Sequence, residues 1–202
     1  MSKIKTVGIV GTGVIGTGWI IRNLAHNKIV HAYDQNKNLK SYVLKEIRRT
    51  SKSIKKLFGK KILIKNLKFF NSLEKALVNV DFVQESVLEN YKVKTDLIHK
   101  ISKYVKSDII ISSSSSGLLP SKIFSKSKNP QRGIIGHPFN PAYLLPAVEI
   151  VPGKKTTKKF LLDANKYYKS ISMKPIMLKK ELPGYLSDRL QEALWREGLH
   201  II

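Results

Sequence analysis

Residues 5–16 read KTVGIVGTGVIG, a short apolar run that leads directly into three glycines. The run from Lys5 to Val10 is typical of a buried β-strand, and residues 14–24 follow with apolar side chains at helical spacing. G-x-G-x-x-G between a strand and a helix is the pattern with which α/β domains approach a pyrophosphate. The stretch predicts a strand-turn-helix unit whose dinucleotide contacts are Gly11, Gly13, Val14, Ile15 and Gly16.

The rest of the chain alternates between apolar runs and helical patterns, which is typical of an α/β fold with a mostly parallel sheet. Further strands are expected at 29–33, 67–70, 80–84, 108–111, 133–136, 147–151 and 174–178, and helices at 39–57, 72–78, 92–105, 156–170 and 185–202. We expect a Rossmann-type doubly wound sheet over residues 1–182. The last helix is amphipathic and needs a partner, so residues 183–202 are expected to begin a truncated all-helical C-terminal domain.

The formal net charge of +23 comes from 37 basic and 14 acidic residues. The lysines are spread along the chain without an arginine cluster or an RNA-binding signature, which favours solvated basic faces over nucleic-acid binding. No cysteine is present, so disulfides and thiolate metal sites are excluded, and no metal is expected. With no signal-peptide pattern and no apolar run of about 20 residues, we expect a cytoplasmic protein without a membrane span.

An acidic residue, Asp34, ends the second predicted strand, at about the distance from the glycines that a ribose-binding carboxylate has in this fold. Such a carboxylate accepts hydrogen bonds from ribose hydroxyls and repels a 2′-phosphate. The cofactor is therefore expected to be NAD rather than NADP.

The carboxyl ends of the predicted strands bring several chemistry-bearing residues to one rim of the sheet. They are Gly11, Asp34, Glu85, the serines at 113–116 and His137. A histidine can accept and return a proton near neutral pH, and Glu149, in a nearby apolar segment, can hold the imidazole. Both residues are also compatible with purely structural roles, and the serines with a flexible polar loop.

The chain resembles the 3-hydroxyacyl-CoA dehydrogenase family, and the resemblance runs almost from end to end. The stretches that carry it are Val7–Trp19, QESVLEN at 84–90, residues 112–120, GHPFNP at 136–141, Val148-Glu149 and PGYLSDRL at 183–190.

The resemblance implies a catalytic pair at His137 and Glu149, and a serine for the substrate hydroxyl at Ser116. It also implies cofactor contacts at Glu89 and Lys94, besides the glycines and Asp34. Asn140 and Asp188 are expected at the substrate. The resemblance further implies a homodimer, in which a second copy of the chain pairs through the C-terminal helical domain.

Two departures from the family pattern bear on the substrate. Asp188 stands where the acyl-CoA enzymes carry an asparagine, and the helical stretch from Leu39 to Gly59 is shorter than their CoA-contacting segment. The expected activity is therefore NAD-dependent oxidation of the 3-hydroxyl of a small 3-hydroxy acid, with L-carnitine as substrate. Aromatic candidates for its trimethylammonium group are Phe139, Tyr143 and Trp195. A 3-hydroxyacyl-CoA substrate and a non-catalytic NAD-binding role are the alternatives.

Overall fold

The first strand, β1 (Thr6–Val10), lies inside an eight-stranded sheet with the order β3-β2-β1-β4-β5-β6-β7-β8. The computed structural model describes residues 4–59 and 61–202, so the first three residues of the predicted 1–182 domain lie outside the described residues. The other strands are β2 (Ile29–Tyr33), β3 (Leu67–Phe70), β4 (Phe82–Glu85), β5 (Ile110–Ser113), β6 (Gly133–Pro138), β7 (Ala147–Pro152) and β8 (Lys174–Met177). The order from β3 to β6 is that of a doubly wound dinucleotide-binding fold, as predicted.

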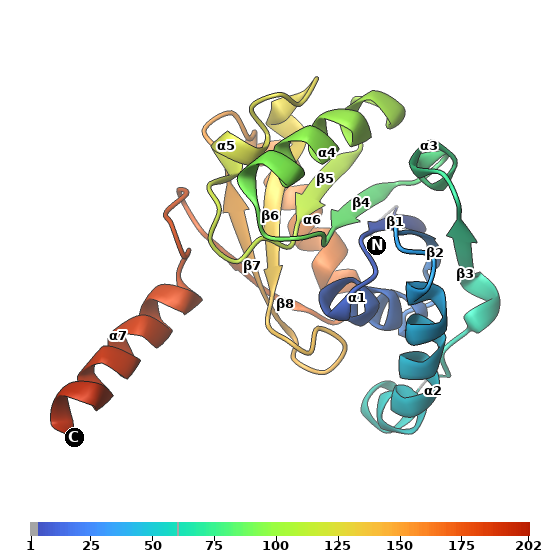
Figure 1. Ribbon diagram of the computed structural model, residues 1–202, viewed down its shortest axis with the longest axis horizontal. Coiled ribbons are helices and arrows are strands. Elements are labelled where there is room, and N and C mark those ends of the chain that lie inside the picture. The colour runs from blue at the N-terminus through green and yellow to red at the C-terminus, as the bar shows by residue number, and fades with distance from the viewer. Residues whose placement is uncertain (1–3, 60) are drawn as a thin grey trace.

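Two layers of helices cover the sheet (Figure 1). The elements are α1 (Val14–Ala25), α2 (Leu39–Phe58), α3 (Leu73–Leu77), α4 (Tyr91–Tyr104), α5 (Pro120–Ile123), α6 (Lys158–Ser170) and α7 (Ser187–Ile201), with short 3-10 turns η1 (Ile64–Asn66) and η2 (Pro130–Arg132). One core cluster joins α1, α2 and α6 to a face of the sheet, and a second joins α3, α4 and α5 to the other face. Because side chains alternate along each strand, Ile9 belongs to the first cluster and Val10 to the second.

The sheet is parallel except for one pair. β6 and β7 run antiparallel, and their register places His137 opposite Glu149. A parallel β7 would have needed a long crossover connection, whereas only residues 139–146 join the two strands. The predicted class of a mostly parallel sheet is confirmed, and this antiparallel pair is what brings the two residues together.

The predicted helices and strands are present, with shifted ends. The predicted helix at 185–202 begins only at Ser187, because Gly184 and Tyr185 have φ angles of +69° and +45°, which no helix accommodates. Strand β5 extends to Ser113 and β6 to Pro138, so Ser113 and His137 lie within strands rather than after them. Helix α5 and the two 3-10 turns were not predicted.

Helix α7 projects away from the sheet (Figure 1), and none of its residues is buried. Its exposed apolar residues include Leu190, Leu194, Trp195 and Leu199. No helix within residues 4–59 and 61–202 has the length and apolar character needed to cross a bilayer.

The first turn of α1 packs directly on the loop that precedes it. A Cβ at Gly16 would overlap the carbonyl oxygen of Gly11, whereas a Cβ at Gly13 would meet nothing within 4 Å. Gly11 itself has a φ of +89°, and a Cβ there would lie 2.7 Å from the carbonyl of Ser86. Gly11 and Gly16 are therefore required by the backbone, while the space beside Gly13 is open.

Gly16→Ala is expected to lower the free energy of unfolding by about 1–3 kcal/mol, because the methyl group forces the helix away from the loop. The helix propensity gained, at most about 1 kcal/mol, does not offset this. Gly198→Ala is the matched control, since Gly198 lies in a helix with open space around it. Urea unfolding checks both variants; equal stability of Gly16→Ala and the unsubstituted protein would contradict the packing described.

Candidate active site

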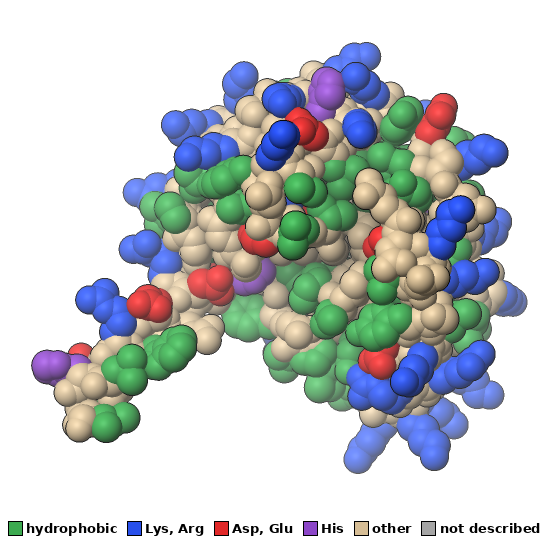
Figure 2. All heavy atoms as spheres, in the orientation of Figure 1, with side chains coloured by type: hydrophobic (Ala, Val, Ile, Leu, Met, Phe, Trp, Pro, Cys, Tyr) green, Lys and Arg blue, Asp and Glu red, His purple; other side chains and the backbone are tan. Residues whose placement is uncertain are grey.

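A cleft of about 1020 Å³ lies between the carboxyl ends of the central strands and α7. Space-filling Figure 2 shows the body hollowed where α7 leaves it, with apolar side chains along the side of α7 that borders the hollow. The lining combines polar residues from the strand ends with apolar residues from α7, and it includes Ile15, Ser86, Glu89, Lys94, Ser116, His137, Asn140, Glu149, Asp188 and Trp195. Most of the predicted site residues thus line one cavity.

The glycine loop has the features that a pyrophosphate needs. The open space beside Gly13 lies at the N-terminus of α1, where unpaired N–H groups and the helix dipole favour an anion. Asp34 lies next to this loop, since one of its oxygens accepts the Thr12 N–H at 2.6 Å and the other accepts the Asn36 N–H at 2.9 Å. The residues present therefore fit a dinucleotide, with Asp34 at the β2 end of the loop.

His137 and Glu149 form a hydrogen-bonded pair on neighbouring strands. Nδ1 of His137 lies 2.7 Å from Oε2 of Glu149, and the Glu149 side chain is fully buried. An ionised carboxylate only accepts hydrogen bonds, so Nδ1 carries the hydrogen and Nε2 carries the lone pair. Among the described residues, Nε2 has no hydrogen-bond partner. The imidazole thus lines the cleft with Nε2 available to accept a proton.

Glu149 also holds the beginning of α7. Its Oε1 accepts the backbone N–H groups of Leu186 and Ser187, both at 2.9 Å, and its Oε2 accepts the Ser187 hydroxyl at 2.6 Å. Burial acts to raise the pKa of Glu149, but the hydrogen bonds from His137, Ser187 and Leu186 outweigh it and lower the pKa below its ordinary value of 4.5. Sequence reasoning missed this role of Ser187 and of the Leu186 backbone.

Tyr185, two residues before the start of α7, packs against His137. Its ring lies edge-on to His137, with ring centroids 5.7 Å apart, and its hydroxyl donates to the Leu118 carbonyl oxygen at 2.6 Å. Burial raises the pKa of Tyr185, so this hydroxyl stays protonated and serves as a fixed donor.

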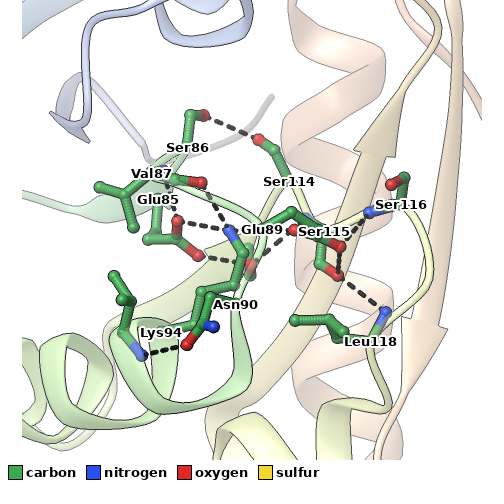
Figure 3. Close-up of polar contacts among 12 residues, drawn as sticks. Glu85, Ser86, Val87, Glu89, Asn90, Lys94, Ser114, Ser115, Ser116 and Leu118 are labelled. Atoms are coloured by element: carbon green, nitrogen blue, oxygen red, sulfur yellow. Dashed lines mark hydrogen bonds and ion pairs between the residues drawn. The ribbon is translucent and has the colours of Figure 1, made fainter.

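A second polar cluster joins the ends of β4 and β5 (Figure 3). The buried Lys94 ammonium lies 2.7 Å from Glu85 and 3.4 Å from Glu89, and it donates to the Val87 carbonyl oxygen. Glu85, which the sequence placed on the rim, is fully buried in this ion pair. Lys94 therefore connects a structural carboxylate to Glu89, the partly exposed carboxylate at the cleft.

The serines at 113–116 have four different environments. Ser113 donates to buried Glu85, and Ser115 donates to Glu89 at 2.5 Å. Ser116 offers its backbone N–H to Glu89 at 3.0 Å and lines the cleft. Ser114 also lines the cleft and binds Trp19. Each of the four serines therefore makes a hydrogen bond to a residue of another segment.

The predicted substrate residues divide into two groups. Asn140, Asp188, Phe139 and Trp195 line the cleft. Tyr143 does not; its hydroxyl lies 3.3 Å from the Arg49 guanidinium, and its side chain packs against the first core cluster. Tyr143 is therefore not placed to contact a substrate in this cavity.

The chain matches the family model described as 3-hydroxyacyl-CoA dehydrogenase, NAD binding domain, over residues 6–182. It is 42% identical over 203 residues to an L-carnitine dehydrogenase of Pseudomonas putida, covering 100% of this chain and 63% of that protein. It is also 42% identical to an L-carnitine dehydrogenase of Oceanobacillus iheyensis, covering 98% of this chain and 65% of that protein. The chain thus spans slightly less than two thirds of the length of these relatives.

Among solved structures, the fold is similar to that of 5-formyl-3-hydroxy-2-methylpyridine 4-carboxylic acid 5-dehydrogenase, an NAD⁺-dependent dismutase. The TM-score is 0.90 at 25% sequence identity, with 98% of this chain and 65% of that chain covered.

Glu149→Gln is expected to lose about 1–3 kcal/mol of folding stability at neutral pH, because a buried site that binds a charged acceptor then holds a neutral amide. Because the pKa of Glu149 is lowered in the folded state, its ionised form stabilises the fold at pH values above the ordinary pKa of the carboxyl group. This contribution is lost as the pH falls through the lowered value. Urea unfolding from pH 7 down to pH 3 should therefore show the difference between the two proteins shrinking below about pH 4.5. A difference that stays constant over that range would contradict the charged hydrogen-bond role.

Proposed function

We propose that this chain, which belongs to the 3-hydroxyacyl-CoA dehydrogenase family, carries the NAD-dependent oxidation of the 3-hydroxyl of a small 3-hydroxy acid, with L-carnitine as substrate. The observation that carries the proposal is the His137–Glu149 pair at 2.7 Å, facing a cleft that a dinucleotide-binding loop adjoins. The L-carnitine dehydrogenases at 42% identity support the choice of substrate.

The proton chemistry falls to His137. Its Nε2 lone pair accepts the proton of the substrate hydroxyl, and Glu149 stabilises the imidazolium through the Nδ1–H hydrogen bond. Ser116, on the β5 side of the cleft, holds the substrate oxygen. NAD, when bound, supplies the acceptor for the hydride that leaves the carbinol carbon. A base and a hydride acceptor on one cleft are what the oxidation of a secondary alcohol requires.

The cofactor is held by the residues that the sequence indicated. Gly11, Gly13, Val14, Ile15 and Gly16 form the pyrophosphate turn at the N-terminus of α1. Asp34 accepts from the ribose hydroxyls at the β2 end of the loop, and Glu89 and Lys94 border the other end at β4. The residues that would hold the cofactor therefore lie after β1, β2 and β4, at the point where the strand order reverses around β1.

The substrate's cationic group is assigned to the α7 side of the cleft. Asp188 lies in the first turn of α7, and Trp195 and Phe139 line the same cavity. A carboxylate with aromatic faces attracts a trimethylammonium group, whereas an acyl-CoA gains nothing from that carboxylate. Asn140, on the exposed loop after β6, is assigned to the substrate's polar end.

The proposal extends to the surroundings of the site. Residues 1–182 are assigned to the NAD-binding domain and residues 183–202 to the start of a helical domain through which two copies pair; the exposed apolar side of α7 supports this. In Figure 2, Lys and Arg side chains lie along the outline of the molecule and are densest at the lower right. Because no RNA-binding signature accompanies these lysines in the sequence, a nucleic-acid partner is not part of the proposal. A cytoplasmic location belongs to the same proposal.

The protein is expected to produce NADH from NAD⁺ and L-carnitine, and little from 3-hydroxybutyryl-CoA, when absorbance is followed under matched conditions.

His137→Gln should lower kcat by about 10²–10⁴-fold, because the base is removed, while the Kd for NAD⁺ stays within about twofold. His99→Gln, whose histidine binds the Lys126 carbonyl oxygen far from the cleft, is the control. Turnover retained in His137→Gln would contradict the assigned base, and a preference for the CoA thioester would contradict the assigned substrate.

A further inference from the structure

Ser86 is the first residue after β4, and it lines the cleft. Among the described residues its Oγ has one hydrogen-bond partner, Oγ of Ser114 at 2.8 Å (Figure 3), and either oxygen can be the donor on distance alone. Which of the two donates decides whether Ser86 has a hydrogen left to offer a ligand.

The side-chain amide of Gln84 has a fixed orientation. Its Oε1 lies 2.7 Å from the Tyr168 hydroxyl, and its Nε2 lies 2.8 Å from Ser114 and 3.4 Å from the Gly136 carbonyl oxygen. The reverse orientation would set the amide oxygen against the Gly136 carbonyl oxygen, two acceptors without a hydrogen between them. Gln84 therefore donates to Ser114.

Ser114 then has no acceptor capacity left. A hydroxyl has one hydrogen and two lone pairs. Indole Nε1–H of Trp19, which can only donate, points at Ser114 Oγ from 3.0 Å, and Gln84 donates to the same oxygen. Both lone pairs are used, so the Ser114 hydrogen is the one that joins Ser114 to Ser86. Ser86 is the acceptor in this contact, and its own hydrogen is free.

The location of Ser86 indicates what that hydrogen meets. In the strand order, β4 and β2 lie on opposite sides of β1. Asp34 marks the adenosine side at β2, so the nicotinamide side of a dinucleotide lies at β4. Ser86 touches the glycine loop, since its carbonyl is what a Cβ at Gly11 would strike. It shares the cleft with His137 on the reacting side.

We infer that Ser86 is a cofactor-binding residue whose hydroxyl donates to an oxygen of the nicotinamide nucleoside half of NAD, either a ribose hydroxyl or the carboxamide oxygen. The inference rests on the proposed cofactor site. The chain Trp19/Gln84 → Ser114 → Ser86 fixes the direction of the donor before any ligand arrives. The hydrogen bond then forms without reorganisation of the protein.

Ser86→Ala is expected to weaken NAD⁺ binding about three- to tenfold, the effect of one neutral hydrogen bond, with unchanged affinity for ADP, which lacks the nicotinamide nucleoside. Calorimetric titration with NAD⁺, ADP-ribose and ADP separates the two oxygens. A loss shared by ADP-ribose assigns the ribose, and a loss confined to NAD⁺ assigns the carboxamide. Ser86→Thr, which keeps the hydroxyl, should restore affinity. Ser41→Ala, at an exposed serine on α2, is the matched control.

Equal NAD⁺ affinity of Ser86→Ala and the unsubstituted protein would overturn this inference and leave the cofactor site standing. An equal loss for NAD⁺ and ADP would also overturn it, because the change would then be general damage to the site. Failure of the unsubstituted protein to bind NAD⁺ at all would overturn the cofactor site together with the inference.

Discussion

The buried carboxylate of Glu149 is the group on which the geometry of the cleft depends. A charge removed from water is tolerated only when hydrogen bonds replace its hydration. Here four donors do so, from His137, the Leu186 and Ser187 backbone, and the Ser187 hydroxyl. One group thus fixes the tautomer of His137 and holds the first residue of α7 in place. The need to hydrogen-bond this buried carboxylate therefore positions both the His137 base and α7, which lines the cleft.

Carboxylates are scarce in a chain with a net charge of +23, yet they gather at this cleft. Glu89, Glu149 and Asp188 line it, and Glu85 lies buried behind it. Glu85 and Glu89 are paired with Lys94, Glu89 also accepts from Ser115 and Ser116, and Glu149 is saturated by donors. Of these four carboxylates, Asp188 is the one without an ion pair or hydrogen bond among the described residues. In the proposed function, Asp188 is the carboxylate that meets the cationic group of the substrate.

Much of the fold could be predicted because periodicity is a local property. The strand and helix patterns, the glycine turn and the position of Asp34 all follow from residues near one another in the sequence. The direction of β7 does not, because it depends on how the short connection at 139–146 folds back. The same holds for Tyr185, whose positive φ makes the last helix begin two residues later than predicted. It holds as well for Tyr143, an aromatic candidate for the trimethylammonium group, whose hydroxyl lies beside Arg49 instead.

The separate roles of the serines at 113–116 could not be predicted from the sequence. Four identical side chains at 113–116 carry no local signal of their separate roles, and each role is set by a partner at least 26 positions away in the chain. Ser86, likewise, gains its free donor only from the combined positions of Trp19, Gln84 and Ser114. Whether a hydroxyl has a hydrogen left to donate depends on all of its partners in the folded protein, so it cannot be predicted from the local sequence.

The central claim is that the Glu149 carboxylate fixes the tautomer of the His137 imidazole, with the hydrogen on Nδ1 and the lone pair on Nε2. ¹⁵N NMR of the labelled protein at neutral pH tests it directly, because protonated and unprotonated ring nitrogens have well-separated shifts. The account predicts a protonated Nδ1 and an unprotonated Nε2 for His137, with the preference lost in Glu149→Ala. A His137 ring with the hydrogen on Nε2 in the unsubstituted protein would contradict it.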